Sequence, residues 1–327
     1  MITVFLKEDG HVERNISPSK LASLNPENVL WIDLLMPSAT EQKSVENFIS
    51  MHLLSKEKAE EIESTSKYYE TSGAIVSNSN YFISKGENYE IEPVSFIVTK
   101  DGVLVSLRHH DLVPFTDTEK RLAQNREDNT TGYHLLITSL EALIDYDADM
   151  VELVTREISK LSKDIAHSPH INKNVIYRIN ELQEKTMSLR EDIFDLQRVI
   201  SGINRSNRFP HEIKTRLEFM NKDIESLIQH GDISFSRLDY MQDTAMGLIN
   251  IEQNEIVKIL SVAAVIFMPP TLIASIYGMN FKVMPELDWV WTTSHGWVIP
   301  AGYIFALALM LLVTFLTYWY FRYKKWL

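Results

Sequence analysis

One helical face near the C-terminus carries amide, hydroxyl and thioether side chains at regular spacing. Steps of three and four residues place such side chains on one side of a helix. The positions are Asn254, Val257, Ser261, Ala264, Met268, Thr271 and Ser275, with Leu260 beside Ser261. A small, weakly polar stripe of this kind in a membrane span usually mediates helix packing, but it can also line a water-filled path.

Conventional catalytic patterns are absent from the sequence, so we expect no enzyme. There is no phosphate-binding Gly-rich loop, no G-x-S-x-G and no H-E-x-x-H pattern. His109-His110 and the pair His167/His170 lack a plausible third ligand, which favours surface histidines over a metal site. An acidic cluster on a predicted long helix indicates a solvated face; its members are Asp145, Asp147, Asp149 and Glu152.

The composition of the 327-residue chain excludes several protein classes. With 45% hydrophobic and 23% charged residues, the chain can bury a sizeable core, and its length corresponds to about two domains. The absence of cysteine excludes disulfides, thiolate metal sites and iron–sulfur clusters. A formal net charge of −12 argues against nucleic-acid partners, because phosphate contacts need clustered basic residues. Surplus carboxylates suit cations, although a solvated acidic surface is the commoner reason for such a charge.

Two long uncharged runs predict membrane-spanning helices in a lipid bilayer. They cover residues 259–281 and 297–321, and each exceeds the ~20 residues that a helix needs to cross ~30 Å of hydrocarbon. Lys258 directly precedes the first run, and Arg322, Lys324 and Lys325 follow the second. Because basic flanks stay in the cytoplasm, we expect a multi-pass protein of the cell (inner) membrane with both termini cytoplasmic and residues 281–296 outside.

The part of the chain before the spans predicts an α+β cytosolic domain, built as an open mixed sheet flanked by helices. Runs rich in β-forming residues occupy 2–6, 29–34, 73–84 and 94–107, and Lys100-Asp101-Gly102 is a hairpin signal within the last. Helical periodicity occupies 40–51 and 55–62. Paired strands with helices between them are typical of this architecture.

From about residue 131 onward the pattern is almost wholly helical. One long amphipathic helix, with apolar residues along one face, is expected up to a break at Ser168-Pro169, and a second helix follows over about 171–203. From His211 to Tyr277 a long helical stalk runs directly into the first span. Gly231 could split this stalk, and the sequence leaves that question open.

The end of the first span resembles the CorA family of magnesium transporters. Gly278-Met279-Asn280 closes the first of two C-terminal spans, and Met284-Pro285-Glu286-Leu287 follows in the short connecting loop. The span segment 267–274 and the terminal residues 324–327 also resemble the family. Three residues alone are weak evidence, but their position between two spans, with the second motif following, is strong evidence.

The resemblance implies a funnel-shaped homopentamer whose first spans surround a central pore. Its regions would be a cytosolic α/β domain over 1–130, a long-helix and stalk region over 131–255, and a membrane domain over 256–327 with two transmembrane helices. The implied function is a divalent cation channel that takes up magnesium, and also cobalt or nickel. Cytosolic magnesium would gate it, so magnesium is both the transported and the regulatory ion.

The resemblance also implies roles for individual residues. Gly278, Met279 and Asn280 would form an outer selectivity ring, and Asp243 would ring the inner mouth; Asn280 and Asp243 are thus the expected metal contacts. The implied pore lining comprises Asn254, Leu260, Met268 and Thr271, with Leu260 at a hydrophobic constriction. The family's regulatory metal site is not placed here, because Phe219 stands where an acid is expected and Asp223 lies only nearby.

The chemistry of magnesium supports a neutral ring at Asn280. Magnesium gives up its water reluctantly, so amide oxygens can hold the hydrated ion through its waters, whereas a carboxylate ring would bind it tightly and slow its release. Gly278 would allow close backbone approach. Glu286 and Asp288 would instead raise the cation concentration at the entrance. Without the family context, Asn280 has the simpler interpretation of a helix C-terminal residue.

The sequence leaves two other functions open. A zinc transporter of the related ZntB type would share the architecture, but the Met284-Pro285-Glu286-Leu287 motif speaks against it. A membrane-anchored scaffold that recruits a cytosolic partner would explain the acidic helices. It would leave the weakly polar stripe and the loop motif without a purpose.

Overall fold

The computed structural model divides the chain into two compact units, Met1–Asp243 and Thr244–Leu327. The structure describes residues 1–7, 12–14, 16–53, 67–85, 88–125, 127–167, 172–280, 282, 284–286, 288–292 and 298–324. The predicted helix over 55–62 and the predicted break at Ser168-Pro169 lie outside these residues. One helix, α7 (Ile213–Tyr277), contributes residues to both units.

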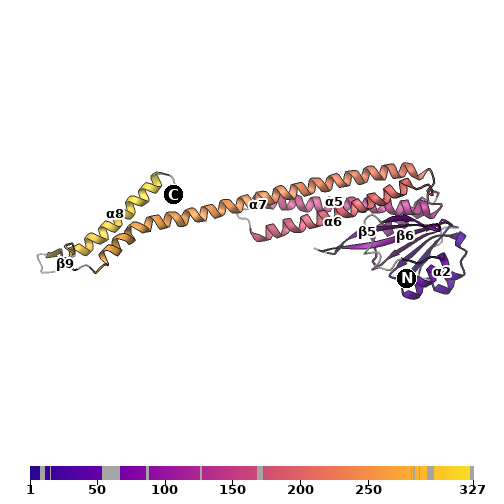
Figure 1. Cartoon of the computed structure of the whole chain (residues 1–327), viewed down its shortest axis with the longest axis horizontal. Coiled ribbons are helices and arrows are strands. Elements are labelled where there is room, and N and C mark those ends of the chain that lie inside the picture. Colours follow the sequence, from indigo (N-terminus) through magenta and orange to yellow (C-terminus); the bar gives the residue numbers. More distant parts are fainter. Residues whose placement is uncertain are drawn as a thin grey trace. The chain divides into compact units, whose positions relative to one another are not determined.

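A mixed sheet of seven described strands forms the centre of the first unit (Figure 1). The strands are β1 (Ile2–Leu6), β2 (Val12–Arg14), β3 (Val29–Leu35), β4 (Tyr68–Glu70), β5 (Ala74–Lys85), β6 (Asn88–Thr99) and β7 (Leu104–Arg108). Their order is β2-β1-β3-β7-β6-β5-β4; β3 and β7 run parallel, and the other described neighbours are antiparallel. The predicted open mixed sheet is confirmed.

Local chemistry explains the central strands and their turn. Six of the seven residues of β3 are buried, as expected for a strand that is covered on both faces. The turn between β6 and β7 contains Gly102 at a φ of 77°, a conformation that side-chain-bearing residues rarely adopt. The Lys100-Asp101-Gly102 hairpin signal therefore marks the turn correctly.

Short helices cover one face of the sheet. They are α1 (Pro18–Ala22), the 3₁₀ helix η1 (Pro26–Asn28) and α2 (Ala39–Ile49), which confirms the helix predicted over 40–51. A capping box starts α2: the Ser38 hydroxyl accepts a hydrogen bond from the Glu41 N–H, and the Ser38 N–H donates to the Glu41 carboxylate. Val45 of α2 and Leu21 of α1 are fully buried in the core on this side.

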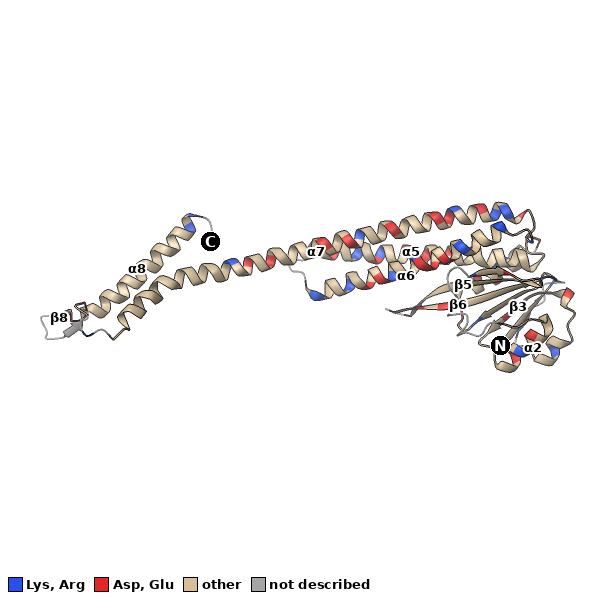
Figure 2. Ribbon diagram, in the orientation of Figure 1, with Lys and Arg blue, Asp and Glu red and all other residues tan. Residues whose placement is uncertain are grey.

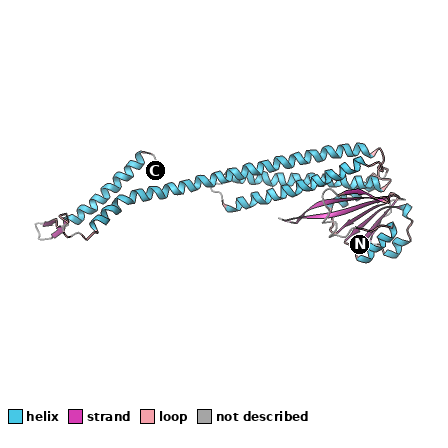
Figure 3. Cartoon of the chain, viewed as in Figure 1, coloured by secondary structure: helices cyan, strands magenta, loops and turns pink. Residues whose placement is uncertain are grey.

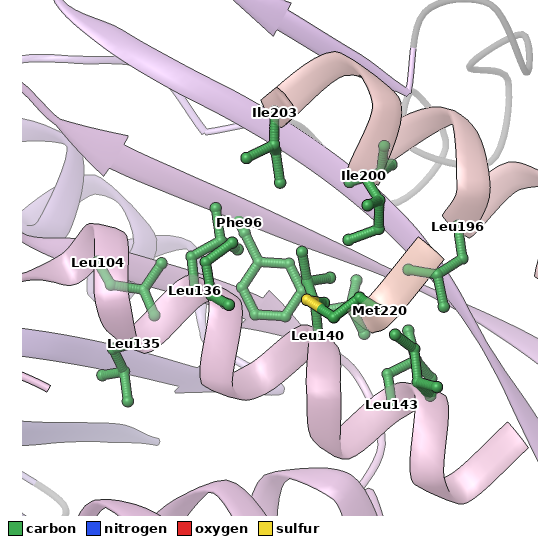
Figure 4. Packing of buried hydrophobic residues seen from close by; sticks show 14 of the residues in the cluster. Phe96, Leu104, Leu135, Leu136, Leu140, Leu143, Leu196, Ile200, Ile203 and Met220 are labelled. Atoms are coloured by element: carbon green, nitrogen blue, oxygen red, sulfur yellow. The ribbon is translucent and has the colours of Figure 1, made fainter. Parts of the chain in front are cut away.

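Longer helices cover the opposite face. They are α4 (Val113–Gln124), α5 (Gly132–His167) and α6 (Lys173–Arg205). Figure 4 shows side chains of α5 and α6 around Phe96 of β6; they include Leu136, Leu140, Leu196 and Ile200. The apolar face predicted for the first long helix is thus the surface that packs on the sheet.

The N-terminal part of α7 packs in the same layer. Leu217, Met220 and Ile224 are buried in the core cluster that contains α5 and α6. The Arg190 guanidinium pairs with Asp232 at 2.9 Å, and Arg237 donates to the Ser159 hydroxyl at 3.0 Å. Both apolar burial and polar contacts therefore hold α7 against its two neighbours within the first unit.

Gly231 does not split the stalk, because α7 is one helix from Ile213 to Tyr277. A glycine in a helix interior costs about 1 kcal/mol relative to alanine. Here the helix packs closely against α6: a methyl group at Gly231 would lie 3.9 Å from the Arg190 side chain. The tertiary contacts of this layer outweigh the local propensity of a single glycine.

The second unit contains the C-terminal part of α7, the short strands β8 (Val290–Thr292) and β9 (Val298–Pro300), and α8 (Ala301–Tyr323). The strands β8 and β9, drawn in magenta in Figure 3, pair antiparallel with each other in a two-stranded sheet. In Figure 2, α8 and the end of α7 carry almost no charged residues. Both helices are long and apolar enough to cross a membrane, and few residues of the apolar 18-residue window in each are buried within the single chain. The described helix α8 begins at Ala301, inside the run predicted over 297–321.

A buried ion pair joins the two parallel strands of the sheet, and its loss should destabilise the first unit. The Arg108 guanidinium donates to both carboxylate oxygens of Asp33, at 2.8 and 3.3 Å, and both residues are less than 5% exposed. Arg108→Ala leaves a buried carboxylate without its charge partner, which typically costs roughly 3–5 kcal/mol of unfolding free energy. Denaturant unfolding of the detergent-solubilised chain, followed by circular dichroism, measures this loss.

The control for this prediction is Arg14→Ala. Arg14 pairs with Glu119 at 2.6 Å, but its side chain is 64% exposed. Exposed pairs contribute about 0–1 kcal/mol. Equal losses for Arg14→Ala and Arg108→Ala would contradict a structural role for the buried pair.

Candidate functional site

The predicted stripe lies along the C-terminal part of α7 and is uncovered in the single chain. Its larger apolar members are well exposed: Leu260 is 65% and Met268 66% exposed. The polar members Asn254, Ser261, Thr271 and Ser275 are exposed as well. From Asn254 to Tyr277 the helix rises ~35 Å at 1.5 Å per residue, which is enough to cross a bilayer.

The opposite face of the same helix differs from the stripe. Val262 is buried within the second unit, and Ile266 and Ile273 are half-buried. Ile259, nearer the start of the span, is exposed. The fold of the second unit thus uses the aliphatic face for its own packing over part of the span. It leaves the weakly polar face for water, lipid or another copy of the chain.

Thr271 shows how a hydroxyl on this face is oriented. Its Oγ1 donates a hydrogen bond to the Phe267 carbonyl oxygen at 2.7 Å. The hydroxyl proton is therefore used within the helix, and the lone pairs of the oxygen stay available as acceptors. Pro269 and Pro270 lie in the same turn and lack N–H groups, so this part of the helix has fewer backbone donors than usual.

The Gly278-Met279-Asn280 motif forms the end of α7. The Gly278 N–H donates to the Ala274 carbonyl at 2.9 Å, and the Met279 N–H donates to the Ile276 carbonyl at 3.2 Å. A Cβ at Gly278 would lie 3.2 Å from the Ala274 carbonyl oxygen, so glycine allows the chain to turn tightly here. Asn280 follows beyond the last helical bond, and it is exposed.

The electrostatics of this helix end suit a cation. The carbonyl groups of the last turn give a helix C-terminus a partial negative charge, which stabilises positive charge nearby. Asn280 adds an amide oxygen at that end without adding a formal charge. The arrangement can therefore attract a hydrated cation and release it again, since no carboxylate is present in the motif itself.

The loop after the motif carries the predicted entrance carboxylates. Glu286 is half-buried and Asp288 is exposed. The next residue, Trp289, packs edge-on against Phe305 of α8, and its carbonyl accepts a hydrogen bond from the Gly302 N–H at 3.2 Å. These contacts connect the loop to the start of α8. Leu287, which belongs to the second sequence motif, lies outside the described residues.

The predicted inner-mouth residue and the expected regulatory position both lie on α7 within the first unit. Asp243 is exposed and is the last residue of that unit. Phe219 is 61% exposed, and the Lys222 ammonium lies 5.7 Å from the centre of its ring. A ring beside an ammonium group offers no oxygen ligand, so Phe219 itself cannot replace an acid in a metal site.

The described histidines of the two groupings contact carboxylate or carbonyl oxygens. His110 Nδ1 lies 2.8 Å from the buried Glu92 carboxylate, and the His109 N–H donates to Glu92 at 2.6 Å. His167 Nδ1 lies 2.7 Å from the Lys163 carbonyl oxygen, and its predicted partner His170 lies outside the described residues. Among the described residues there is no group of three or more His, Asp or Glu that could hold a metal ion.

The acidic cluster on α5 is a solvated face except at one position. Asp145, Asp149 and Glu152 are exposed, whereas Asp147 is only 3% exposed. The prediction of a solvated face is therefore wrong for Asp147. A sequence signal existed: position 147 falls three residues after Ile144 and four before Val151, on the apolar face of the helix.

Comparison with known proteins identifies relatives along the whole chain. Residues 26–325 match the family described as "CorA-like Mg2+ transporter protein". A protein from Wolinella succinogenes named "Magnesium transport protein CorA" is 34% identical over 332 residues, covering all of both chains. The corresponding protein of Escherichia coli K12 is 32% identical over 302 residues, which are 92% of each chain.

A solved structure shows the same fold. The structure of the CorA magnesium transporter from Methanocaldococcus jannaschii aligns with a TM-score of 0.80 at 18% identity, covering 100% of this chain and 98% of that one. The family match and the full-length relatives agree with the Gly278-Met279-Asn280 motif at the end of α7. The chain therefore belongs to the family of CorA-like Mg²⁺ transporter proteins.

Proposed function

We propose that this chain forms a homopentameric channel that takes up Mg²⁺ across the cell membrane, with the α7 stripe as the wall of the pore. The observation that carries this proposal is the exposed, weakly polar face of α7 that ends at Gly278-Met279-Asn280. Two candidate spans per chain cannot enclose a path for an ion. Several copies of α7 around one axis can do so, and each then covers the stripe of its neighbours.

The hydration of magnesium determines which groups the wall needs. Mg²⁺ keeps several waters in its shell, and those waters direct their hydrogens outward. A wall that holds the hydrated ion must therefore present acceptors. The Asn280 amide and the Thr271 hydroxyl, whose proton is bonded to Phe267, supply such acceptors at two levels of the helix. Asn254 supplies an amide at the cytoplasmic end of the stripe.

Apolar residues on the same face supply the means to close the path. Leu260 and Met268 are exposed on the stripe, so each contributes a ring when copies of α7 surround one axis. A narrow apolar ring blocks ions by dewetting, and modest widening hydrates it. We assign Leu260 to the hydrophobic constriction and Asp243 to a carboxylate ring at the inner mouth. Glu286 and Asp288 raise the cation concentration at the outer entrance.

Cobalt and nickel fit the same pore, because the proposed contacts act on the shell of water rather than on the bare ion. A zinc transporter of the ZntB type is the alternative from the same architecture. The ZntB cytoplasmic domain from Vibrio parahaemolyticus aligns with a TM-score of 0.57 at 11% identity over 77% of this chain, a likeness of fold only. The Met-Pro-Glu-Leu motif at residues 284–287 favours magnesium over this alternative.

The first test concerns the outer ring. Asn280→Ala removes one acceptor, worth about 1 kcal/mol, from each of five subunits. The combined loss of roughly 5 kcal/mol of contacts to the hydrated ion should lower Mg²⁺ uptake by about a thousandfold or more. Asn280→Asp keeps the oxygen but adds charge, so it should alter selectivity or slow release. Uptake of Mg²⁺ into proteoliposomes measures both effects.

The matched control is Thr317→Ala, which removes a polar side chain from α8 that bonds only to the Val313 carbonyl in the described structure. Thr317→Ala should transport at the rate of the unmodified protein. Normal Mg²⁺ uptake by correctly assembled Asn280→Ala would refute the ring assignment.

A second test concerns topology and assembly. The chain has no cysteine, so Val290→Cys, Ser19→Cys and Lys324→Cys each introduce a single thiol at an exposed position. An impermeant maleimide added to intact cells should label position 290 but neither 19 nor 324. In detergent the mass of the protein component should be five times 37.8 kDa. External labelling at position 19, or a monomeric mass, would overturn the proposed arrangement.

A third test concerns gating by cytosolic magnesium. The soluble unit is acidic, and internal Mg²⁺ between adjacent subunits would screen their repulsion and favour a closed, compact state. This requires tighter binding of Mg²⁺ to the closed state than to the open state, since equal affinity shifts nothing. Leu260→Asn should conduct at high internal Mg²⁺, because a polar ring does not dewet.

The control for gating is Ile259→Asn, which places the same side chain one residue earlier, off the stripe. It should retain inhibition by internal Mg²⁺. Flux measured at several internal Mg²⁺ concentrations distinguishes the two variants. Uptake that ignores internal Mg²⁺ in the unmodified protein would reject the gating proposal and leave the transport proposal standing.

A further inference from the structure

Two aspartates occupy core positions of the helical layer in the first unit. Asp147 lies between Ile144 and Val151 on the buried face of α5, and it is 3% exposed. Asp192 lies between Leu189 and Leu196 on the buried face of α6, and it is 6% exposed. The two helices pack against each other, and α6 also packs on β5. Carboxyl groups at such positions are rare unless they are paired with a cation.

The polar contacts of Asp192 are incomplete. Its Oδ1 accepts a hydrogen bond from the Asn80 side-chain amide at 3.2 Å, and the Asn80 Oδ1 accepts one from the Lys67 ammonium at 3.1 Å. Its Oδ2 is buried and has no hydrogen-bond partner among the described residues. The Tyr81 hydroxyl of β5, which interacts electrostatically with Asp147, is also buried without a described partner. A buried acceptor and a buried hydroxyl are thus left unsatisfied in this layer.

The titratable groups around Asp147 and Asp192 do not compensate the negative charge of the two carboxylates. Those that act on the two carboxyl groups or on their immediate neighbours are Lys67 before β4, Tyr81 of β5, Tyr146 of α5, and Glu191 and Asp195 of α6. Arg108 and Asp33 also act on Tyr81, but they form their own buried pair. Lys67 is 5% exposed and bonds Asn80, with its Nζ 4.0 Å from Asp195. One buried ammonium therefore faces several carboxyl groups.

Burial and mutual repulsion both favour the protonated forms. Burial raises the pKa of Asp192 to about 7, with Asp195 and Glu191 adding to the shift, while Asn80 and Lys67 oppose it. Burial also raises the pKa of Asp147 well above its ordinary value of 3.8, and the charge of Asp192 raises it further. Burial in turn lowers the pKa of Lys67.

A proton fits this cluster better than a metal ion. No group of three or more His, Asp or Glu in the described part of the chain could hold a metal ion. The Asn80 side-chain oxygen, which could serve as a further ligand, already accepts a hydrogen bond from the Lys67 ammonium. A proton on one carboxyl group converts an acceptor into a donor. It thereby removes a buried charge and offers a partner to an unsatisfied oxygen.

We propose that Asp147 and Asp192 hold a proton at neutral pH, and that loss of this proton loosens the packing of α5 and α6 on β5. The pair is then a pH-sensitive element built into the soluble unit. It is independent of the proposed transport function, because it concerns the stability of the fold rather than the path of an ion.

The direction of the pH effect follows from linkage. A carboxyl group whose pKa is raised in the folded state binds more protons folded than unfolded. Its stabilising effect is complete below the ordinary pKa of 3.8 and is lost as pH rises toward about 7 for Asp192. Asp147, which is also raised, extends the loss to higher pH. The first unit should therefore become less stable from pH 5.5 to pH 8.5.

Thermal unfolding of the full chain in detergent at constant Mg²⁺ tests this proposal. The unmodified protein should lose roughly 5 °C or more in midpoint between pH 5.5 and 8.5. Asp192→Asn and Asp147→Asn mimic the protonated state, so each should unfold at a higher temperature at pH 8.5 and show a smaller pH dependence. Two variants are used because either one alone could disturb the layer.

The matched controls are Asp149→Asn on α5 and Glu184→Gln on α6, both exposed carboxylates of the same helices. They should keep the pH dependence of the unmodified protein. Hydrogen exchange, corrected for the intrinsic rate, should rise at pH 8.5 in peptides of α5, α6 and β5, and less so in Asp192→Asn. If both core variants kept the full pH dependence, or if the controls lost it equally, the proposal that Asp147 and Asp192 hold a proton would be wrong.

Discussion

The reluctance of magnesium to leave its water is the constraint on which the proposed function depends. A hydrated divalent ion cannot enter ~30 Å of hydrocarbon, and carboxylates in the outer selectivity ring would bind it tightly and slow its release. In the proposed pore, the C-terminal part of α7 would meet both conditions with neutral acceptors such as the Asn280 amide and the Thr271 hydroxyl. The negative end of the helix dipole adds attraction without a fixed charge.

The two units use carboxyl groups in different ways. In the first unit most carboxylates are exposed or paired with arginine, as in the contact of Asp232 with Arg190. Asp33 is buried, but Arg108 compensates its charge fully. Asp147 and Asp192 are buried without an equivalent cation. In the described part of the second unit the formal charges stand at the ends of the spans or in the loop, and the stripe itself carries none.

Much of the fold follows from patterns in the sequence. Alternating and continuous apolar runs indicate the central strands, Gly102 marks a turn, and the apolar faces of α5 and α6 mark the layer that covers the sheet. Short edge strands such as β2 and β4 are missed, because three residues carry too little periodicity. The continuity of α7 through Gly231 depends on contacts with α6, which no local pattern reveals.

The candidate site, like the fold, is only partly predictable from the sequence. Spacing alone places the stripe on one helical face, and the motif at residues 278–280 marks its end. The hydrogen bond that turns the Thr271 oxygen into a pure acceptor, and the close approach of the Ala274 carbonyl at Gly278, become visible only in the structure. For Asp147 the two sequence patterns disagree. The run of acidic residues predicts an acidic surface, but the position of Asp147 on the apolar face of the helix places it in the core.

Flux of Mg²⁺ through the purified chain in liposomes tests the central claim most directly. Liposomes that enclose a magnesium-sensitive dye would be given external Mg²⁺ alone, and then Mg²⁺ in competition with Co²⁺, Ni²⁺ or Zn²⁺. The account predicts that Mg²⁺ enters down its gradient in the presence of no other protein, and that Co²⁺ and Ni²⁺ slow its entry. Entry of Zn²⁺ with no entry of Mg²⁺, or no flux of any divalent ion, would contradict it.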